Sequence, residues 1–600
     1  MTQTASDLLA RRLGADSIIE TTAAGSGHPT SSLSAAHLMA VLFDQYMRLD
    51  KDDPAHLAND RFVLSKGHGA PVLYATLAAL GVIPREELEH LREEGSPLEG
   101  HPVPGLPHID VATGSLGQGL PNALGMALGL RILGSPARVW VMLGDSEMAE
   151  GSVWEALALA SHHEVTNLVA ILDMNRLGQT GPTMYGRDAD LYARRVSSFG
   201  WHPVVVDGHD TDAIAAAYDE ATDNGPAMVI ASTVKGWGVD AVANEVGEHG
   251  KALGEEEASN AIEQLAPPPP MPLEVEGPEV FTPPTLEPSD YELPRIGEPV
   301  ATRDAFGEAL AAIVAADPRV VVFDAEVGNS TRTDSVEKST PERFIQMYIA
   351  EQAMVGAATG LQALGLIPVV STFSAFLTRA HDFLRMAAIS DARLVVNGSH
   401  AGVSIGEDGP SQMGLDDIAM MRGLFGSTVL YPADGPATVA LTEQAIATGG
   451  ITYIRTTRGE TPVLPEPTNG FEIGGSRTLR HSGDDSVTVI AAGITVFEAL
   501  TAADGLVDRP VRVIDAYSIQ PIDREAIRRA AAETKRLIVV EDHGTVGGLG
   551  DAVLEAVSDL DVTVTKLAVT GWPGSATQEQ QLELAGISAR AITVAIRSSA

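Results

Sequence analysis

The 600-residue chain contains no cysteine. This absence excludes disulfides, zinc–thiolate sites, iron–sulfur clusters and thiol nucleophiles. Basic residues are also scarce, because 40 Lys and Arg stand against 80 Asp and Glu and leave a formal net charge of −40. A non-specific nucleic-acid binder needs a basic face that displaces counterions, and binding to an anionic membrane surface also needs basic residues. Both kinds of partner are therefore excluded.

The sequence has no uninterrupted apolar run of about 18 residues or more, so we expect no membrane span. The first 14 residues lack the apolar segment of a signal peptide and place Arg11 and Arg12 in a helical pattern, so we expect a cytoplasmic protein. Apolar residues make up 44% of the chain, which is enough for several cores and unlike a disordered acidic tail.

One segment marks a clear domain boundary. From Gly254 to Pro299 the chain is rich in proline and acidic residues, a composition that is extended, stiff and unable to form a core. We predict an interdomain linker over residues 254–299, one domain over residues 1–253, and two more over 300–468 and 469–600, with a softer boundary near Pro465–Gly475.

Short apolar runs alternate with amphipathic helical stretches on both sides of the linker. This alternation is typical of α/β domains with mainly parallel sheets, in which ligands bind at the carboxyl ends of the strands. The predicted strands are Arg138–Leu143, Leu168–Leu172, Pro203–Val206, Ala227–Ala231, Val320–Phe323, Ile367–Ser371, Leu394–Asn397, Thr428–Tyr431, Thr452–Arg455, Val487–Ala491, Val511–Asp515, Leu537–Glu541 and Val562–Leu567.

Polar residues follow two successive strands before the linker. Asp145 comes directly after the first of them, and Asn175 follows the second. Because a predicted helix, Ser152–His162, separates the strands, both loops reach one sheet edge, where a carboxylate and an amide oxygen can bind a hard cation such as Mg²⁺. A Gly-Asp turn after a strand is common by itself, so the paired Asn175 carries most of the weight.

Histidines recur in glycine- or proline-rich loops, at His28, His68, His101 and His249. A histidine in such a loop is more often positioned for a ligand than one in a helix or strand, and a three-histidine zinc site stays an alternative. The run Thr113–Gly119 adds closely spaced glycines before a predicted helix, an arrangement that suits a diphosphate.

The second domain contains the strings YIAEQ, STFSAF, GSHAG and GEDGPSQ. Glu351 starts an otherwise apolar helix, where it serves either as an ordinary N-terminal acid or as a buried carboxyl that binds a ligand nitrogen. Taken singly, Phe373 and Phe376 are typical of a core, and Arg303 and Arg458 are typical of a solvated surface.

Taken together, these motifs resemble the transketolase family of thiamine-diphosphate enzymes over essentially the whole chain. The likeness is carried by AGSGHPTSS, RFVLSKGHGAP, GHPVP, DVATGSLGQGLPNA, GDSE, ILDMNRLGQ, YIAEQ, STFSAF and GSHAGVSIGEDGPSQM. The chain length and the GEDGPSQ string are similar to the shorter branch that includes the animal enzymes.

The resemblance implies the thiamine-diphosphate-binding α/β fold, with a diphosphate-binding domain, a pyrimidine-binding domain and a structural C-terminal α/β domain in chain order. It implies a cytoplasmic homodimer with active sites at the subunit interface. It also implies a pentose phosphate pathway activity: reversible transfer of a two-carbon ketol unit from a ketose phosphate to an aldose phosphate, via dihydroxyethyl-thiamine diphosphate. The implied metal is Mg²⁺, with Ca²⁺ or Mn²⁺ as alternatives.

The resemblance also assigns residue roles. Mg²⁺ would be held by Asp145, Asn175 and the main-chain carbonyl of Leu177. The cofactor would contact Ser31, His68, Gly114, Ser115, Leu116, Ser146, Asn175, Lys235, His249, Phe373, Phe376 and Gln412. The catalytic groups would be Glu351, His28, His101 and His249. The substrate would contact His28, Arg303, Ser330, His400, Asp408 and Arg458.

Two positions depart from the family pattern. Ser146 stands where the family usually has glycine, so it would be strained if that position needs a positive φ and harmless if only its N–H is used. We favour the second interpretation, because the other cofactor positions match. Glu248 stands where the animal enzymes tend to have an aromatic residue, which would alter substrate access.

Three other functions are weighed against transketolase. A deoxyxylulose-phosphate synthase shares the three-domain plan but lacks the GSHAGVSIGEDGPSQ pattern. A dihydroxyacetone synthase differs mainly in accepting formaldehyde, so the motifs leave it open. A catalytically inactive paralogue is disfavoured, because the metal ligands, the diphosphate loop and Glu351 are all present.

Overall fold

The computed structural model describes residues 4–598. The chain forms two compact units, one reaching to Thr285 and including Gly356–Gly365, the other made of Leu286–Val355 and the chain from Leu366 onward. No helix among the described residues is long and apolar enough to cross a membrane.

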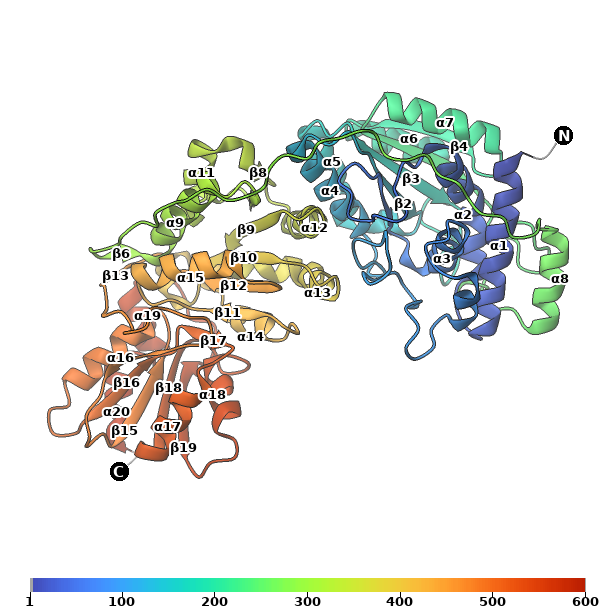
Figure 1. The fold of residues 1–600 in the computed structure, drawn as a ribbon. Coiled ribbons are helices and arrows are strands. Elements are labelled where there is room, and N and C mark those ends of the chain that lie inside the picture. Colours follow the sequence, from blue (N-terminus) through green and yellow to red (C-terminus); the bar gives the residue numbers. More distant parts are fainter. Residues whose placement is uncertain (1–3, 599–600) are drawn as a thin grey trace. The chain divides into compact units, whose positions relative to one another are not determined.

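The first unit contains a five-stranded parallel sheet in the order β1-β2-β3-β5-β4, which we call the first sheet. Its strands β2, β3 and β4 are labelled in Figure 1. Its strands are β1 Arg61–Leu64, β2 Val139–Gly144, β3 Leu168–Met174, β4 His202–Asp207 and β5 Ala227–Ser232. Its helices are α1 Ala5–Ala23, α2 Pro29–Val41, α3 Ala70–Ala79, α4 Gly119–Leu133, α5 Gly151–His162, α6 Ala189–Ser198, α7 Thr211–Asp223 and α8 Glu255–Leu265.

The strand β1 was not predicted from the sequence. It has four residues and begins with Arg61, a charged residue that does not signal a buried strand. The Arg61 side chain is nevertheless buried, because its guanidinium donates to the carbonyls of Pro54 and His56 and to Asp110. The charge is thus satisfied inside the fold, which a hydrophobicity pattern does not reveal.

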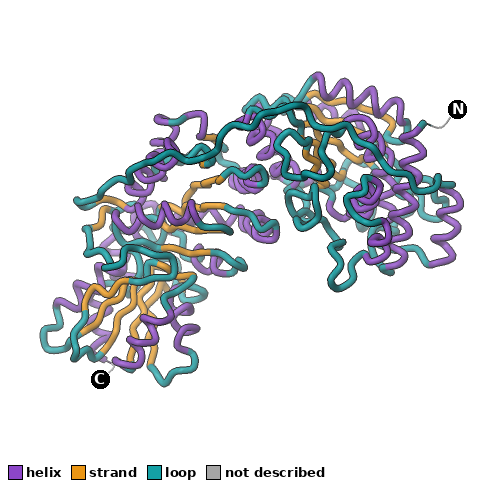
Figure 2. Tube along the Cα trace, in the orientation of Figure 1, coloured by secondary structure: helices purple, strands orange, loops and turns teal. Residues whose placement is uncertain are grey.

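The predicted linker is only partly extended. Its first part forms α8, whose acidic first turn favours a helix N-terminus and whose Glu257 accepts a hydrogen bond from the Gly254 amide. Ala258, Ala261 and Leu265 of this helix are buried in an apolar cluster, so helical periodicity prevails before the first proline. Residues 266–299 contain no helix or multi-residue strand and are drawn as loop in Figure 2, in agreement with the prediction.

The second unit contains a seven-stranded sheet in the order β17-β11-β12-β10-β9-β7-β8, which we call the second sheet. Its strands are β7 Val320–Asp324, β8 Phe344–Gln346, β9 Ile367–Phe373, β10 Leu394–Ser399, β11 Thr428–Leu430, β12 Ile451–Arg455 and β17 Ser518–Gln520. The helices in this part of the chain are α9 Thr302–Ala316, α10 Gly328–Thr331, α11 Asp334–Ser339, α12 Glu351–Gln362, α13 His381–Ile389, α14 Asp417–Arg422 and α15 Gly435–Ala447. The short strands β6 Val300–Ala301 and β13 Glu460–Thr461 pair with each other.

The same unit contains a five-stranded sheet in the order β14-β16-β15-β18-β19, which we call the third sheet. Its strands are β14 Arg477–Arg480, β15 Val487–Ala491, β16 Val511–Asp515, β18 Arg536–Gly544 and β19 Thr563–Val569. Its helices are α16 Thr495–Asp504, α17 Arg524–Thr534, α18 Leu549–Val557, α19 Gln578–Leu584 and α20 Ala589–Ser598. The fold class predicted from the sequence, α/β with mainly parallel sheets, is confirmed.

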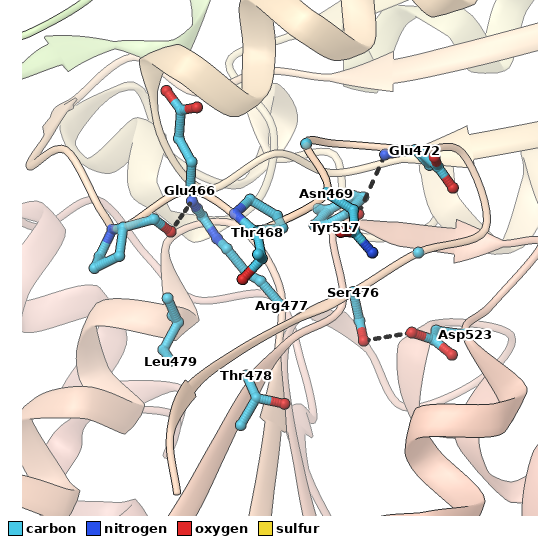
Figure 3. Close-up of a pocket in the computed structure, with 14 residues that line it drawn as sticks. Glu466, Thr468, Asn469, Glu472, Ser476, Arg477, Thr478, Leu479, Tyr517 and Asp523 are labelled. Atoms are coloured by element: carbon cyan, nitrogen blue, oxygen red, sulfur yellow. Dashed lines mark hydrogen bonds between the residues drawn. The ribbon is translucent and has the colours of Figure 1, made fainter.

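The second and third sheets are interlocked. The strand β17 lies in sequence between strands of the third sheet, yet it pairs antiparallel with β11 of the second (Figure 1). The segment Pro465–Leu479 lines a cavity of about 510 Å³ together with Tyr517 and Asp523 (Figure 3). Arg477 of this segment donates to Asp434 at the start of α15 and to Asp515 at the end of β16. The predicted boundary near Pro465–Gly475 is therefore followed by a residue that bonds to both sheet regions.

Candidate active site

Four neighbouring strands of the first sheet end at one edge, and a predicted site residue follows each of them. His68 follows β1, Asp145 follows β2, Asn175 follows β3 and Lys235 follows β5. All four line one cavity of about 460 Å³, which we call the first-sheet site. The same cavity is lined by the predicted residues His28, His101, Gly114, Leu116, Ser146, Leu177 and His249.

Three oxygen-bearing groups meet at the ends of β2 and β3. Asp145 is buried and accepts hydrogen bonds from the amides of Ser146 and Arg176 at 3.0 and 2.6 Å. Asn175 directs its Nδ2 to Asp173 at 3.2 Å, so its Oδ1 faces the opposite way and accepts from the amide of Leu177. Burial raises the pKa of Asp145 to about 6, and the charge of Asp173 adds to the effect.

The backbone between these ligand candidates is turned sharply. Arg176 has a φ of 67°, a left-handed conformation that is uncommon outside glycine. The Leu177 carbonyl accepts a hydrogen bond from Lys235 Nζ at 2.8 Å, and Nζ also lies 2.6 Å from His249 Nδ1. A carbonyl oxygen has two lone pairs, so this contact leaves one for a cation.

Ser146 is not strained. Its φ of −63° and ψ of −34° lie in the right-handed helical region, which any residue adopts easily. The interpretation that a serine here would be forced into a positive φ is therefore wrong. The Ser146 amide donates to Asp145 Oδ1 at 3.0 Å, a contact that either serine or glycine can make here.

The glycine-rich loop before α4 has two positions where no side chain fits. Gly114 has a φ of 122°, and a Cβ there would lie 2.9 Å from the ring of His101. Gly117 has a φ of 85° and would place a Cβ 2.6 Å from Glu150. Side chains are excluded at both positions, and the loop, with Ser115 between Gly114 and Leu116, leads into the N-terminus of α4.

The four loop histidines gather beside the oxygen groups. The ring of His28 lies 5.3 Å from that of His68, 5.0 Å from that of His249 and 6.3 Å from that of His101, between centroids. Among residues 4–598, no group of three or more His, Asp or Glu side chains has an arrangement that could hold a metal ion. The structure therefore gives no support to a three-histidine zinc site in this part of the chain.

These imidazoles are neutral at physiological pH. Burial lowers the pKa of His28 to about 3 and that of His249 to about 4, and neighbouring histidines and Lys235 add to the effect. Burial also lowers the pKa of His101 and lowers that of His68 well below its usual value. Each neutral ring has one N–H donor and one acceptor nitrogen, which suits hydrogen bonding to hydroxyl groups.

Ser31 has a free hydroxyl next to this cluster. It lies in the first turn of α2, is fully buried, and its Oγ has no hydrogen-bond partner among the described residues. Ser31 does not line the cavity itself, but buried hydroxyls are normally satisfied, so its unpaired Oγ three residues after His28 is consistent with a ligand contact.

Three charged residues of this site were not assigned a role from the sequence. Lys66 and Asp173 form a buried ion pair, and Lys66 also donates to the Ser31 carbonyl at 3.1 Å. Asp173 accepts in addition from Ser34, Thr233 and Asn175. The pair therefore joins the loops that present Ser31, His68, Asn175 and Lys235.

Glu147 joins a second set of loops. Its buried carboxylate accepts from Ser65 after β1, from the Gly117 amide at 2.8 Å and from the Gly144 amide at 3.0 Å. Burial raises its pKa, and these hydrogen bonds oppose the shift. The available signal for Lys66, Asp173 and Glu147 was their position inside the motifs RFVLSKGHGAP, ILDMNRLGQ and GDSE.

A second group of predicted residues gathers in the second unit, and we call it the second-sheet site. Glu351 is buried as the first residue of α12, and its carboxylate lies 3.5 Å from Arg379. Phe373 ends β9, and its ring stacks on Phe376 at 5.4 Å and on His400 at 4.2 Å between centroids. The three rings thus form one stack.

Cationic and polar groups surround the His400 end of this stack. Arg303 Nη1 donates to His400 Nε2 at 3.1 Å and to the Ser330 carbonyl at 3.2 Å. Burial lowers the pKa of His400 to about 3, and the charges of Arg303 and Arg458 lower it further. Arg458 lies 3.5 Å from Asp408, another predicted substrate-binding residue.

The first-sheet and second-sheet sites lie in different units, and Gln412 belongs with the second. The first-sheet site fits a metal diphosphate, because it combines hard oxygen donors with a glycine loop that excludes side chains before the N-terminus of α4. The second-sheet site fits an aromatic ring that carries a nitrogen, because it combines stacked phenylalanines with a buried carboxyl.

Family models match nearly the whole chain. "Transketolase, thiamine diphosphate binding domain" matches residues 3–281, "Transketolase, pyrimidine binding domain" matches 298–463, and "Transketolase, C-terminal domain" matches 476–592. Human transketolase is 46% identical to this chain, covering 98% of it and 96% of the human protein. The mouse transketolase-like protein 2 is 44% identical, with the same coverage.

Solved structures show the same fold. The transketolase of Leishmania mexicana superposes with a TM-score of 0.88 at 24% identity, covering 99% of this chain and 97% of its own. The fold predicted from the resemblance, three α/β regions of the thiamine-diphosphate-binding type, is confirmed. The chain belongs to the transketolase family and is a thiamine-diphosphate-dependent transferase.

Proposed function

We propose that this protein is an active transketolase. It transfers a two-carbon ketol unit reversibly from a ketose phosphate such as xylulose 5-phosphate to an aldose phosphate such as ribose 5-phosphate or erythrose 4-phosphate, in the pentose phosphate pathway. The observation that carries the proposal is the gathering of four neutral histidines beside Asp145, Asn175 and the Leu177 carbonyl in one cavity. This arrangement combines a metal–diphosphate site with groups that bind sugar hydroxyls.

The first-sheet site would hold the diphosphate end of the cofactor. Asp145, Asn175 and the Leu177 carbonyl would bind Mg²⁺, because their hard oxygens suit that ion. The backbone of Gly114–Leu116 and of Ser146, with His68, Ser31 and Lys235, would donate hydrogen bonds to phosphate oxygens. Ca²⁺ and Mn²⁺ suit similar donors and stay alternatives.

The second-sheet site would hold the pyrimidine end. Phe376 and Phe373 would pack against the ring, Gln412 would contact the cofactor, and Glu351 would hydrogen-bond a ring nitrogen. When bound, thiamine diphosphate supplies the carbanion that attacks a ketose carbonyl and holds the electron pair after the C–C bond breaks.

The protein's own groups would orient the sugar and move its protons. His28, His101 and His249 are neutral, so each can donate to one sugar oxygen and accept from another. Arg303 and Arg458 present guanidinium groups, which bind phosphate bidentately, with His400 and Ser330 beside Arg303. Asp408, beside Arg458, would accept from a sugar hydroxyl.

Each half of the site belongs to a different unit, and we propose that a two-fold homodimer pairs the first-sheet site of one subunit with the second-sheet site of its partner. The domain boundaries at 253, 299 and 468 belong to this proposal, with the three domains in the order given by the family. The cytoplasmic location stays a prediction from the sequence.

A coupled assay with xylulose 5-phosphate and ribose 5-phosphate tests the proposal. We expect turnover that requires both thiamine diphosphate and Mg²⁺ and that is lost in Glu351→Ala. Formaldehyde as acceptor is the comparison, since a clear preference for it would instead show a dihydroxyacetone synthase. No turnover with any acceptor, together with no calorimetric binding of thiamine diphosphate in the presence of Mg²⁺, would show an inactive paralogue.

A further inference from the structure

The loop between β10 and α14 carries His400, Asp408 and Gln412 but makes little regular structure of its own. It consists of two short 3₁₀ turns, Val403–Asp408 and Pro410–Gln412. Three of its glycines, Gly402, Gly406 and Gly409, have positive φ values between 71° and 80°. Such a loop needs partners outside itself to keep one conformation.

The apolar partners of this loop come from the third sheet. Val403, Ile405, Met413 and Leu415 are buried in one hydrophobic cluster with residues of the third-sheet region, among them Val540 of β18. The loop of the second-sheet site is therefore part of a core that is built mainly by residues 487–596.

A buried carboxylate of β18 holds the first part of the loop. Asp542 is 1% exposed, and its Oδ1 accepts a hydrogen bond from the Val403 amide at 2.8 Å. Its Oδ2 packs against Gly402, where a Cβ would lie only 1.8 Å away. The carboxylate thus fixes the backbone two to three residues beyond His400.

A buried guanidinium links this contact to the other end of the loop. Arg455 is fully buried and donates to the Asp542 carbonyl at 2.8 Å and to the Gly414 carbonyl at 2.9 Å. Its Nε donates to Asp417 at 2.7 Å, and Tyr453 donates to the same carboxylate. Both ends of the loop are therefore tied to one hydrogen-bonded cluster.

We propose that Asp542 is a positioning residue of the second-sheet site, which fixes the Gly402–Gln412 loop so that His400, Asp408 and Gln412 keep the geometry that binds the sugar phosphate and cofactor. The inference rests on the proposed function for what the loop binds. It gives the third-sheet region a role in the reaction, beyond the structural role that the family resemblance implied.

Two substitutions at Asp542 separate positioning from stability. Asp542→Ala removes the acceptor of the Val403 amide, whereas Asp542→Asn keeps an acceptor oxygen in the same place. We expect Asp542→Ala to raise KM for the sugar phosphates about 10- to 100-fold with a smaller change in kcat, and Asp542→Asn to restore most of this loss.

The neighbouring Glu541→Gln is the matched control. Glu541 is also buried on β18 but faces Gly548 and Gly550 at the start of α18 instead of the loop. We expect this variant to leave KM unchanged. Equal KM shifts in Asp542→Ala and Glu541→Gln would overturn the inference.

Hydrogen exchange of residues 402–413 tests the inference without an activity assay. We expect Asp542→Ala to speed exchange in this segment and Glu541→Gln to leave it unchanged. If Asp542→Ala does not fold, Gly402→Ala disturbs the same contact from the loop side and should give the same result. Wild-type protection of this segment in both Asp542→Ala and Gly402→Ala overturns the inference. Absence of ketol transfer in the wild-type protein overturns the proposed function alone.

Discussion

The first-sheet and second-sheet sites are supported in different ways. In the first, the functional loops follow neighbouring strands of one sheet, and the buried carboxylates of Asp173 and Glu147 join those loops directly. In the second, the loop that carries His400, Asp408 and Gln412 depends on Asp542, which lies 139 positions after Val403 in the chain.

This difference has a consequence for where mutations act. A change in the first-sheet site disturbs residues that are already near one another along the sheet edge. A change in the third sheet reaches the second-sheet site although it touches none of its functional side chains. If the two sites are supported independently, a mutation that weakens the support of one should leave the other unchanged.

The largest loss of activity is expected when one of the two sites is inactivated by mutation. Asp145→Ala removes the carboxylate of the proposed metal site, and Glu351→Ala removes that of the pyrimidine site, each with a loss of about 10²–10⁴-fold in kcat. If a homodimer shares its sites, mixing the two inactive variants creates heterodimers with one intact site. Random reassociation should then restore about a quarter of wild-type activity, measured in the coupled assay.

The control is a mixture of Asp145→Ala with Asn175→Ala, two changes in the same site. This mixture should stay inactive, because every site then retains a defect. Recovery in the control, or none in the Asp145→Ala and Glu351→Ala mixture, would contradict a site shared between subunits. Native mass spectrometry of the mixture, with an affinity tag on one variant, would show whether the subunits had exchanged.

The sequence could place Asp145 and Asn175 at one sheet edge, because both directly follow strands that were recognisable. Asp145 and Asn175 follow β2 and β3, and parallel strand ends share an edge. The inference needed no knowledge of side-chain packing. The loop pattern singled out the four histidines, the resemblance gave them roles, and the structure brings them into the same cavity.

The residues that support the sites were harder to predict. Lys66 and Asp173 form a buried ion pair although they are 107 positions apart in the sequence. A local sequence pattern cannot predict a pair of this kind. The strand β17 lies among third-sheet elements but pairs with β11, which alternation of strands and helices cannot reveal. The helix α8 was not predicted, because residues 254–299 were interpreted as one segment and most of that segment is rich in proline.

The second prediction concerns the ion pair of the first-sheet site. Lys66→Met leaves the fully buried Asp173 without its cation, so we expect a loss of about 3–5 kcal/mol in the free energy of unfolding, measured by urea denaturation. Thiamine diphosphate binding should weaken as well. Hydrogen exchange in the Gly402–Gln412 loop should stay at the wild-type rate, because this loop belongs to the other unit.

Two further variants show whether the effect comes from the buried charge. Lys51→Met removes a lysine from an exposed ion pair with Asp52 and should change stability by at most about 1 kcal/mol. The double variant Lys66→Met/Asp173→Asn removes both charges and should recover part of the loss. A double variant less stable than Lys66→Met would contradict the account of an unpaired buried carboxylate.

The smallest effect is expected at the joint between the second and third sheets. Asp515 is fully buried, accepts from Arg477, and has an Oδ1 without a partner among the described residues. Burial raises its pKa to about 7, opposed by Arg477 and supported by the charge of Asp434. The folded protein therefore holds this proton more tightly than the unfolded chain, so the stability contribution is full below about pH 4 and falls as pH rises toward 7.

Asp515→Asn removes this titration while keeping an oxygen for Arg477, which lines the cavity of Figure 3. We expect the Tm of the variant relative to the wild type to be higher at pH 8 than at pH 5, by a few degrees in thermal unfolding. Asp559→Asn is the control, because Arg528 lowers the pKa of the exposed Asp559 to about 2, so its effect should be constant over this range. A pH-independent Tm difference for Asp515→Asn would mean that the Asp434–Arg477–Asp515 cluster stays fully ionised. The joint would then be held by two ionised carboxylates on one guanidinium at both pH 5 and pH 8.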